Sequence, residues 1–126
     1  MKQAKPPRLI FWETTAACNL ECAHCRRIEV SAKLSSHDLT TDQARTMLDD
    51  IADYAKPILI LSGGEPLMRT DIFDLAAHAD RRGLPVALAT NGVMIDDATA
   101  RRVAECGIRR VSISFDGASA TNHDAF

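Results

Sequence analysis

The sequence lacks any long hydrophobic segment. No apolar run approaches the roughly 18 residues that a membrane-spanning helix needs, and the residues from Met1 to Pro7 are polar where a secretory signal has an apolar centre. The 126-residue chain also lacks a charge excess, because its formal net charge is −2. These absences argue against nucleic acid or a membrane as a partner. We therefore expect a cytoplasmic protein.

The chain also has no low-complexity segment and no internal linker. Its composition, with 46% hydrophobic and 25% charged residues, is that of an ordinary globular domain. A chain of 126 residues suits one domain with one hydrophobic core. We therefore expect residues 1–126 to belong to a single domain.

Cysteine is scarce, and its placement is uneven. Of the four cysteines, Cys18, Cys22 and Cys25 fall within eight residues, and Cys106 stands alone. In cytosolic proteins cysteines are more often metal ligands or catalytic groups than disulfide partners. Iron–sulfur clusters usually take four thiolates, so three would leave one iron of a four-iron cluster open to a substrate or cofactor. Cys106 is expected to be a small, buried, apolar residue.

Two other interpretations of these cysteines stay open. A structural zinc ion needs four closed ligands, and His24 or His37 could supply the fourth beside the three thiols. Alternatively, Cys22 and Cys25 form a CxxC redox pair, which leaves Cys18 without a role. The alternatives to a cluster protein are thus a non-catalytic, zinc-stabilised α/β module and a thiol oxidoreductase.

Hydrophobic periodicity predicts alternating strands and helices. Thr40 and Gln43 form a capping-box pattern at the start of the first long helix, and Gly83 suits the position after the end of the second. The alternation is typical of a parallel α/β sheet. The predicted strands cover residues 8–13, 58–61, 84–89 and 110–115, and the predicted helices cover approximately 40–56, 72–79 and 97–105.

Polar and small residues follow each predicted strand. In parallel α/β folds, sites assemble at the carboxyl ends of the strands, so these four segments are expected to meet at one rim. They are the cysteine segment after Glu13, the pair Gly63-Gly64, the turn Asn91-Gly92 and the pair Asp116-Gly117. In the fourth strand, Ser112 and Ser114 are expected to face the barrel interior, on the side of the sheet away from the helices, and Val111, Ile113 and Phe115 are expected to face the helices.

Four strands and three helices do not close a barrel, and an unpaired strand edge would remain. The repeating pattern calls for a further helix after the fourth strand, where the sequence reaches Phe126. We therefore expect the chain to be the N-terminal portion of a longer protein.

Four motifs together resemble the radical S-adenosylmethionine (radical SAM) enzymes. The similarity extends from about Arg8 to Gly117, and the motifs follow successive strands in order. The surroundings of the cysteines resemble the branch that modifies haem precursors, and also the larger SPASM-type relatives that modify peptides and carry auxiliary clusters. The motifs are Cys-x3-Cys-x2-Cys, Gly63-Gly64-Glu65-Pro66, Thr90-Asn91-Gly92 and Ser112-Ile113-Ser114-Phe115-Asp116-Gly117.

The resemblance implies a partial (β/α)6 TIM-like barrel of which the chain holds the first four strands. It implies a 4Fe–4S cluster on Cys18, Cys22 and Cys25, with S-adenosylmethionine bound to the open iron. Reductive cleavage of that cofactor then yields a 5′-deoxyadenosyl radical that abstracts hydrogen from a substrate. Such an enzyme is an oxidoreductase whose cofactors carry the chemistry while the protein positions them.

The resemblance also implies the residues that contact S-adenosylmethionine. The main chain at Gly64 is expected to meet its amino group, with support from Glu65, and His24 is expected to pack near its adenine. An exposed loop histidine and a plain glycine turn are the alternatives for these positions. The full set of expected contacts is His24, Gly63, Gly64, Glu65, Thr90, Asn91 and Ser114.

By the same resemblance, the electron donor is a flavodoxin or ferredoxin. The substrate is a haem or other tetrapyrrole precursor, or a peptide, and the sequence does not decide between them. In this family later strands and the C-terminal extension usually hold the substrate. Residues 1–126 alone are therefore expected not to be competent for full turnover.

Overall fold

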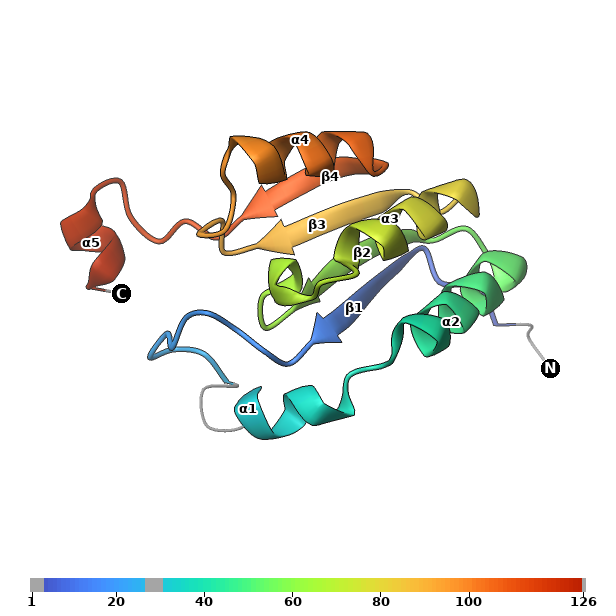
Figure 1. Cartoon of the computed structure of the whole chain (residues 1–126), viewed down its shortest axis with the longest axis horizontal. Coiled ribbons are helices and arrows are strands. Elements are labelled where there is room, and N and C mark those ends of the chain that lie inside the picture. The colour runs from blue at the N-terminus through green and yellow to red at the C-terminus, as the bar shows by residue number, and fades with distance from the viewer. Residues whose placement is uncertain (1–3, 27–30, 126) are drawn as a thin grey trace.

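Four parallel strands form a single sheet in which each strand pairs with the next one in sequence (Figure 1). The computed structural model describes residues 4–26 and 31–125. This confirms the α/β class and the parallel sheet predicted from the sequence. The strands, in their order across the sheet, are β1 (Leu9–Thr15), β2 (Ile58–Gly63), β3 (Val86–Thr90) and β4 (Ile108–Ile113).

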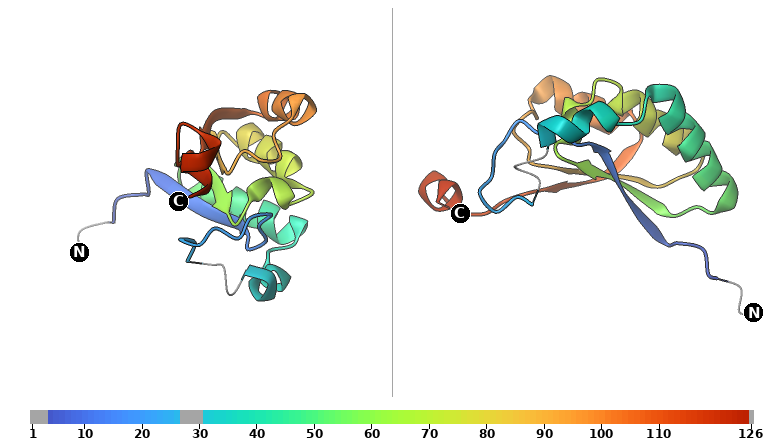
Figure 2. Two further views of the ribbon diagram at one scale, coloured as in Figure 1. Left: turned by 90° about the vertical axis from the view of Figure 1, so that its left-hand side faces the viewer. Right: turned by 90° about the horizontal axis from the view of Figure 1, so that it is seen from below.

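The three longest helices of the described chain lie on one face of the sheet, and the other face is left uncovered (Figure 2). Within residues 4–26 and 31–125, no helix is both long and apolar enough to cross a membrane. The three helices are α2 (Thr41–Tyr54), α3 (Ile72–Arg81) and α4 (Asp97–Glu105); the shorter ones are α1 (Ser31–Leu34), η1 (Ser35–His37), η2 (Pro66–Met68) and α5 (Ala120–Asp124).

Local sequence signals explain where the helices begin. The capping box before α2 is present, with Gln43 N donating to Thr40 Oγ1 at 3.3 Å and Thr40 N donating to Gln43 Oε1 at 2.9 Å. Asp96 accepts a hydrogen bond from Thr99 N at the start of α4. Such caps satisfy amide groups that have no partner within the helix.

The hydrophobic core lies between the sheet and the helices. Alternate residues of β2 and β3 point into it, and helices α2 and α3 supply the opposite wall. Burying one such leucine contributes about 1.5–3 kcal/mol, so this layer dominates the stability. Its fully buried large members are Leu48, Leu59, Leu61, Ile72, Leu75, Leu84, Val86 and Leu88.

Most element boundaries differ from the prediction by one or two residues; β1 and β2, for example, each end two residues later than predicted. Strand β3 begins at Val86, because Leu84 N bonds to Ala79 O and so completes the end of α3. Strand β4 begins and ends two residues earlier than expected. The short helices α1 and α5 were not predicted, because neither has enough residues to show a period.

The two faces of β4 are as predicted, but the burial is not. Ser112 pairs with Ala89 on the uncovered face, and Val111 pairs with the buried Leu88 on the helix face. However, Val111, Ile113 and Phe115 are 41%, 54% and 76% exposed. The reason is that α4 buries only Val103, and no other described helix covers the end of β4.

Candidate metal and cofactor site

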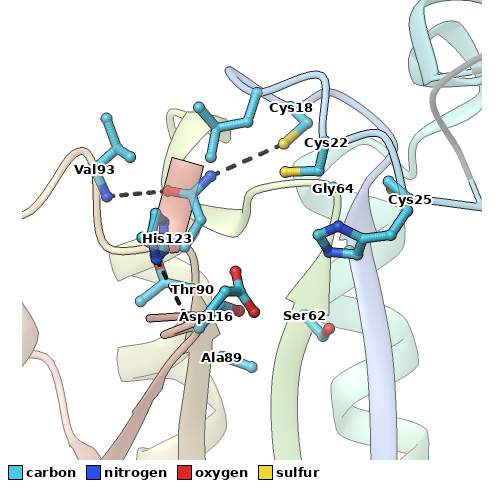
Figure 3. Close-up of a pocket in the computed structure, with 15 residues that line it drawn as sticks. Cys18, Cys22, Cys25, Ser62, Gly64, Ala89, Thr90, Val93, Asp116 and His123 are labelled. Atoms are coloured by element: carbon cyan, nitrogen blue, oxygen red, sulfur yellow. Dashed lines mark hydrogen bonds between the residues drawn. The ribbon is translucent and has the colours of Figure 1, made fainter. Parts of the chain in front are cut away.

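The carboxyl ends of the strands surround one hollow of about 310 Å³, as the sequence predicted (Figure 3). It is bounded by the cysteine segment, by the ends of β2, β3 and β4, and by α5. Every predicted site residue except Glu65 lines it. The lining is Cys18, Leu20, Cys22, His24, Cys25, Ser62, Gly63, Gly64, Ala89, Thr90, Asn91, Val93, Ser114, Asp116 and His123.

The three clustered thiols occupy one side of this hollow. Cys18 and Cys22 are partly buried, Cys25 is exposed, and none of them forms a disulfide. A turn joins the last two, since Cys25 N donates to Cys22 O at 2.9 Å. The thiols therefore share a rim with the paired glycines, on a segment that carries no regular helix or strand.

The donor set is of the type that holds an iron–sulfur cluster, because its three clustered side chains are all thiols. In a four-iron cluster each thiolate binds a different iron, so three sulfurs around one hollow suffice. The chain would hold the cluster through Cys18, Cys22 and Cys25.

An aspartate anchors the start of the cysteine segment. Asp38, which precedes α2, accepts a hydrogen bond from Thr15 Oγ1 at 2.5 Å and one from Ala16 N at 3.0 Å. Thr15 Oγ1 in turn accepts from Ala17 N at 3.1 Å. These bonds fix the backbone immediately before Cys18. No local sequence signal points to Asp38, because it lies more than twenty positions from Thr15 in the chain.

An arginine anchors the same segment from the other side. Arg69 Nη1 donates to Thr14 O at 2.9 Å, and its Nε lies 2.6 Å from Asp71 Oδ1. Thr41 Oγ1 donates to Asp71 at 2.6 Å. Burial alone would raise the pKa of Asp71, but the hydrogen bonds from Arg69 and Thr41 outweigh it and lower that pKa below 3.8. The guanidinium also lies 5.7 Å from the centroid of the Trp12 ring.

The paired glycines pack against the cysteine segment. Gly64 N donates to Thr15 O, and Glu65 N donates to Ala17 O, both at 2.8 Å. A Cβ on Gly64 would lie 2.1 Å from Ala17 O, and one on Gly63 would lie 2.4 Å from Thr15 O. We expected glycine here so that a ligand could approach. The backbone of the cysteine segment already requires it on one side, while the other side lines the hollow.

Glu65 is fully buried beneath the hollow and does not line it. Its carboxylate accepts hydrogen bonds from Thr90 Oγ1 at 2.7 Å, Asn91 N at 2.8 Å and Leu67 N at 3.1 Å. It thus joins the end of β2 to the end of β3. This arrangement gives Glu65 a positioning role, and its predicted contact with the cofactor stays a prediction.

The other predicted contacts lie around the hollow. Ser114 follows β4, and its amide donates to Thr90 O at 3.0 Å, which holds the two strand ends together. Asn91 Nδ2 donates to Asn19 Oδ1 at 2.8 Å, so β3 is linked to the cysteine segment. His24 lies between two of the thiols in sequence and lines the same hollow. Their contacts with a bound cofactor stay predictions.

Helix α5 brings a histidine that the sequence analysis missed. His123 lines the hollow, and its Nδ1 accepts a hydrogen bond from Asp116 N at 3.1 Å. Ser119 caps α5 by accepting a hydrogen bond from Asn122 N at 3.3 Å. The serine three positions before Asn122 is the signal that could have predicted this helix.

Cys106 lies outside the site. It is partly buried against the core, and its thiol lies 3.4 Å from Val103 O. Burial raises the pKa of this thiol, so the nucleophilic thiolate is disfavoured. This environment agrees with the apolar role expected from the sequence.

Comparisons with known proteins place most of the chain in one family. The model of the radical SAM superfamily matches residues 12–126. An AdoMet-dependent heme synthase of Methanosarcina barkeri is 48% identical over 120 residues, which cover 95% of this chain and 34% of that protein. A pre-heme d1 synthase of Dinoroseobacter shibae is 46% identical over 121 residues, which cover 96% and 30%. The chain therefore spans about a third of the length of these curated relatives.

A solved structure shares the fold. The crystal structure of BtrN in complex with AdoMet and 2-DOIA superposes with a TM-score of 0.81 at 17% identity, covering 94% of this chain and 49% of that chain. At this identity the likeness concerns the fold alone. It agrees with the partial barrel implied by four parallel strands in sequential order. With the family match over residues 12–126 and the three thiols at the carboxyl rim, the chain belongs to the radical SAM superfamily.

Proposed function

We propose that this chain binds a 4Fe–4S cluster through Cys18, Cys22 and Cys25 and holds S-adenosylmethionine beside it. The observation that carries the proposal is the single hollow that these thiols share with Gly64 and Ser114. Three thiolates leave one iron without a protein ligand, which is the position where a small molecule can bind.

When both are bound, the reduced cluster and S-adenosylmethionine supply a 5′-deoxyadenosyl radical for abstraction of a hydrogen atom from the substrate. The chain contributes the geometry. Asp38 and Arg69 fix the backbone ahead of Cys18, and Glu65 fixes the end of β3 relative to the end of β2. Gly64 and Ser114 both line the hollow. The main chain at Gly64 is proposed to receive the cofactor's amino group, and the hydroxyl of Ser114 its carboxylate.

We further propose a tetrapyrrole precursor as the substrate of the protein that carries this chain. The two relatives reported above are named for haem-type products, and each matches almost the whole of this chain. A peptide substrate is the alternative left by the sequence. A low-potential flavodoxin or ferredoxin would supply the electron, and the cytoplasmic location stays a prediction.

The test of the proposed function is S-adenosylmethionine cleavage. After anaerobic reconstitution with iron and sulfide, the protein is incubated with dithionite and S-adenosylmethionine, and 5′-deoxyadenosine is measured by chromatography. We expect 5′-deoxyadenosine to form only with reductant. A colourless protein that retains one zinc ion would contradict the proposal. So would a reconstituted protein that releases no 5′-deoxyadenosine and whose cluster signal does not respond to S-adenosylmethionine. The same assay with iron-protoporphyrin precursors tests the substrate class.

A further inference from the structure

Asn91 is held rigidly at the end of β3. Its backbone amide donates to the buried carboxylate of Glu65 at 2.8 Å, and its side-chain Oδ1 accepts a hydrogen bond from Val93 N at 3.0 Å. The second bond uses the amide oxygen, so it leaves the Nδ2 group directed to the other side of the residue. Both ends of Asn91 are therefore fixed before any ligand binds.

The Nδ2 group faces the cysteine segment. It carries two hydrogens, and the structure gives it two acceptors, Asn19 Oδ1 at 2.8 Å and Cys18 Sγ at 3.9 Å. In Figure 3 a dashed line ends at the Cys18 sulfur. A neutral thiol is a weak acceptor, whereas an ionised sulfur accepts a markedly stronger hydrogen bond. A cysteine that ligates iron is a thiolate, so this contact would strengthen when a cluster is present.

We propose that Asn91 sets the reduction potential of the cluster through a hydrogen bond to the Cys18 sulfur. This inference rests on the proposed function. Hydrogen bonds to cluster sulfurs are one of the factors that set cluster potentials. The reduced cluster carries one more negative charge than the oxidised cluster, so the donor stabilises the reduced form more and raises the potential. Asn91 is thus a positioning and tuning residue of the thiol rim, and its role does not depend on which substrate the protein takes.

The test is the midpoint potential of the reconstituted protein, followed by electron paramagnetic resonance during a dithionite titration. Asn91→Ala removes the donor without adding charge. At a fixed ambient potential we expect the ratio of reduced to oxidised cluster to fall about tenfold, which is about 59 mV for a one-electron couple. Asn91→Asp keeps the oxygen that Val93 N requires but replaces the donor with a negative oxygen, so its potential should fall further.

Asn19→Asp is the matched control. It introduces the same charge beside the same sulfur, since Asn19 Oδ1 lies 4.0 Å from Cys18 Sγ, but it leaves both hydrogens of the Asn91 amide in place. We expect a smaller fall than for Asn91→Asp. A fall of equal size in the two Asp variants, together with an unchanged potential in Asn91→Ala, would overturn the inference, because charge alone would then explain the data.

Iron analysis separates this inference from the proposed function. If the unmodified protein itself assembles no cluster, the proposed function fails and the inference fails with it. If the unmodified protein assembles a cluster but Asn91→Ala assembles none, Asn91 is a structural requirement of assembly, and the tuning role is refuted. Normal iron content with a lowered potential is the result that supports it.

Discussion

Replacing Gly64 with alanine should disconnect the second strand from the cysteine segment. The new Cβ would lie 2.1 Å from Ala17 O and 2.8 Å from Ala16 O. Both are backbone atoms, so no side-chain rotation relieves the overlap. The segments must separate, which breaks the bonds from Gly64 N to Thr15 O and from Glu65 N to Ala17 O. At about 1 kcal/mol for each bond, plus the cost of the overlap, we expect a loss of about 2–4 kcal/mol.

The separation should also displace Cys18, which directly follows Ala17. The free energy of unfolding of the metal-free protein is measured with denaturant, and iron content is measured after anaerobic reconstitution. A Cβ on Gly83 would meet only the Lys56 side chain, at 3.7 Å, although the φ of +82° there strains any residue other than glycine. Gly83→Ala is therefore the control for a substitution without backbone overlap. It should cost about 1–2 kcal/mol and leave iron content unchanged. Unchanged stability and full iron content in Gly64→Ala would refute this reasoning.

Three further predictions concern single side chains. Glu65→Gln should cost about 3 kcal/mol of unfolding free energy: the Gln carbonyl can keep the bonds that Thr90 and Leu67 N donate to Oε1, but an NH2 group replaces the Oε2 that accepts from Asn91 N, so two buried donors oppose each other. The exposed Glu105→Gln should change the same free energy by less than about 0.5 kcal/mol. Cys22→Ala should abolish cluster assembly, and full iron content would exclude Cys22 as a ligand. Asp71→Asn should cost about 2 kcal/mol of unfolding free energy at neutral pH. Because the pKa of Asp71 is lowered in the folded state, the stability that its carboxylate contributes is present above pH 3.8 and is lost as the pH falls through the folded pKa. Below about pH 4 the variant should therefore lose less stability than the unmodified protein, and the same loss of stability in both proteins on acidification would contradict this.

The sequence predicted the elements whose signals are local. The capping box at Thr40 and Gln43, and the glycine after α3, fixed helix boundaries to within a few residues. The four strand ends met at one rim because parallel strands leave no other arrangement. The faces of Ser112 and Val111 followed from the two-residue period of a strand.

The remaining features depend on contacts between distant residues. Nothing near Asp38 in the sequence indicates that it binds the backbone at Ala16, and nothing near Arg69 indicates that it reaches Thr14. The exposure of Ile113 and Phe115 also depends on which helices cover β4, and a strand pattern alone does not contain that information. Glu65 was predicted to belong to the site, but its burial under the rim required the fold.

The central claim is that three thiols at the rim of a parallel sheet hold a cluster with one open iron. The most direct measurement is iron and sulfide analysis of the anaerobically reconstituted protein, joined to electron paramagnetic resonance of the reduced protein before and after S-adenosylmethionine is added. The account predicts about four irons and four sulfides per chain, and a signal that changes when the cofactor is added. A protein that binds one zinc ion, or a cluster whose signal is indifferent to the cofactor, would contradict it.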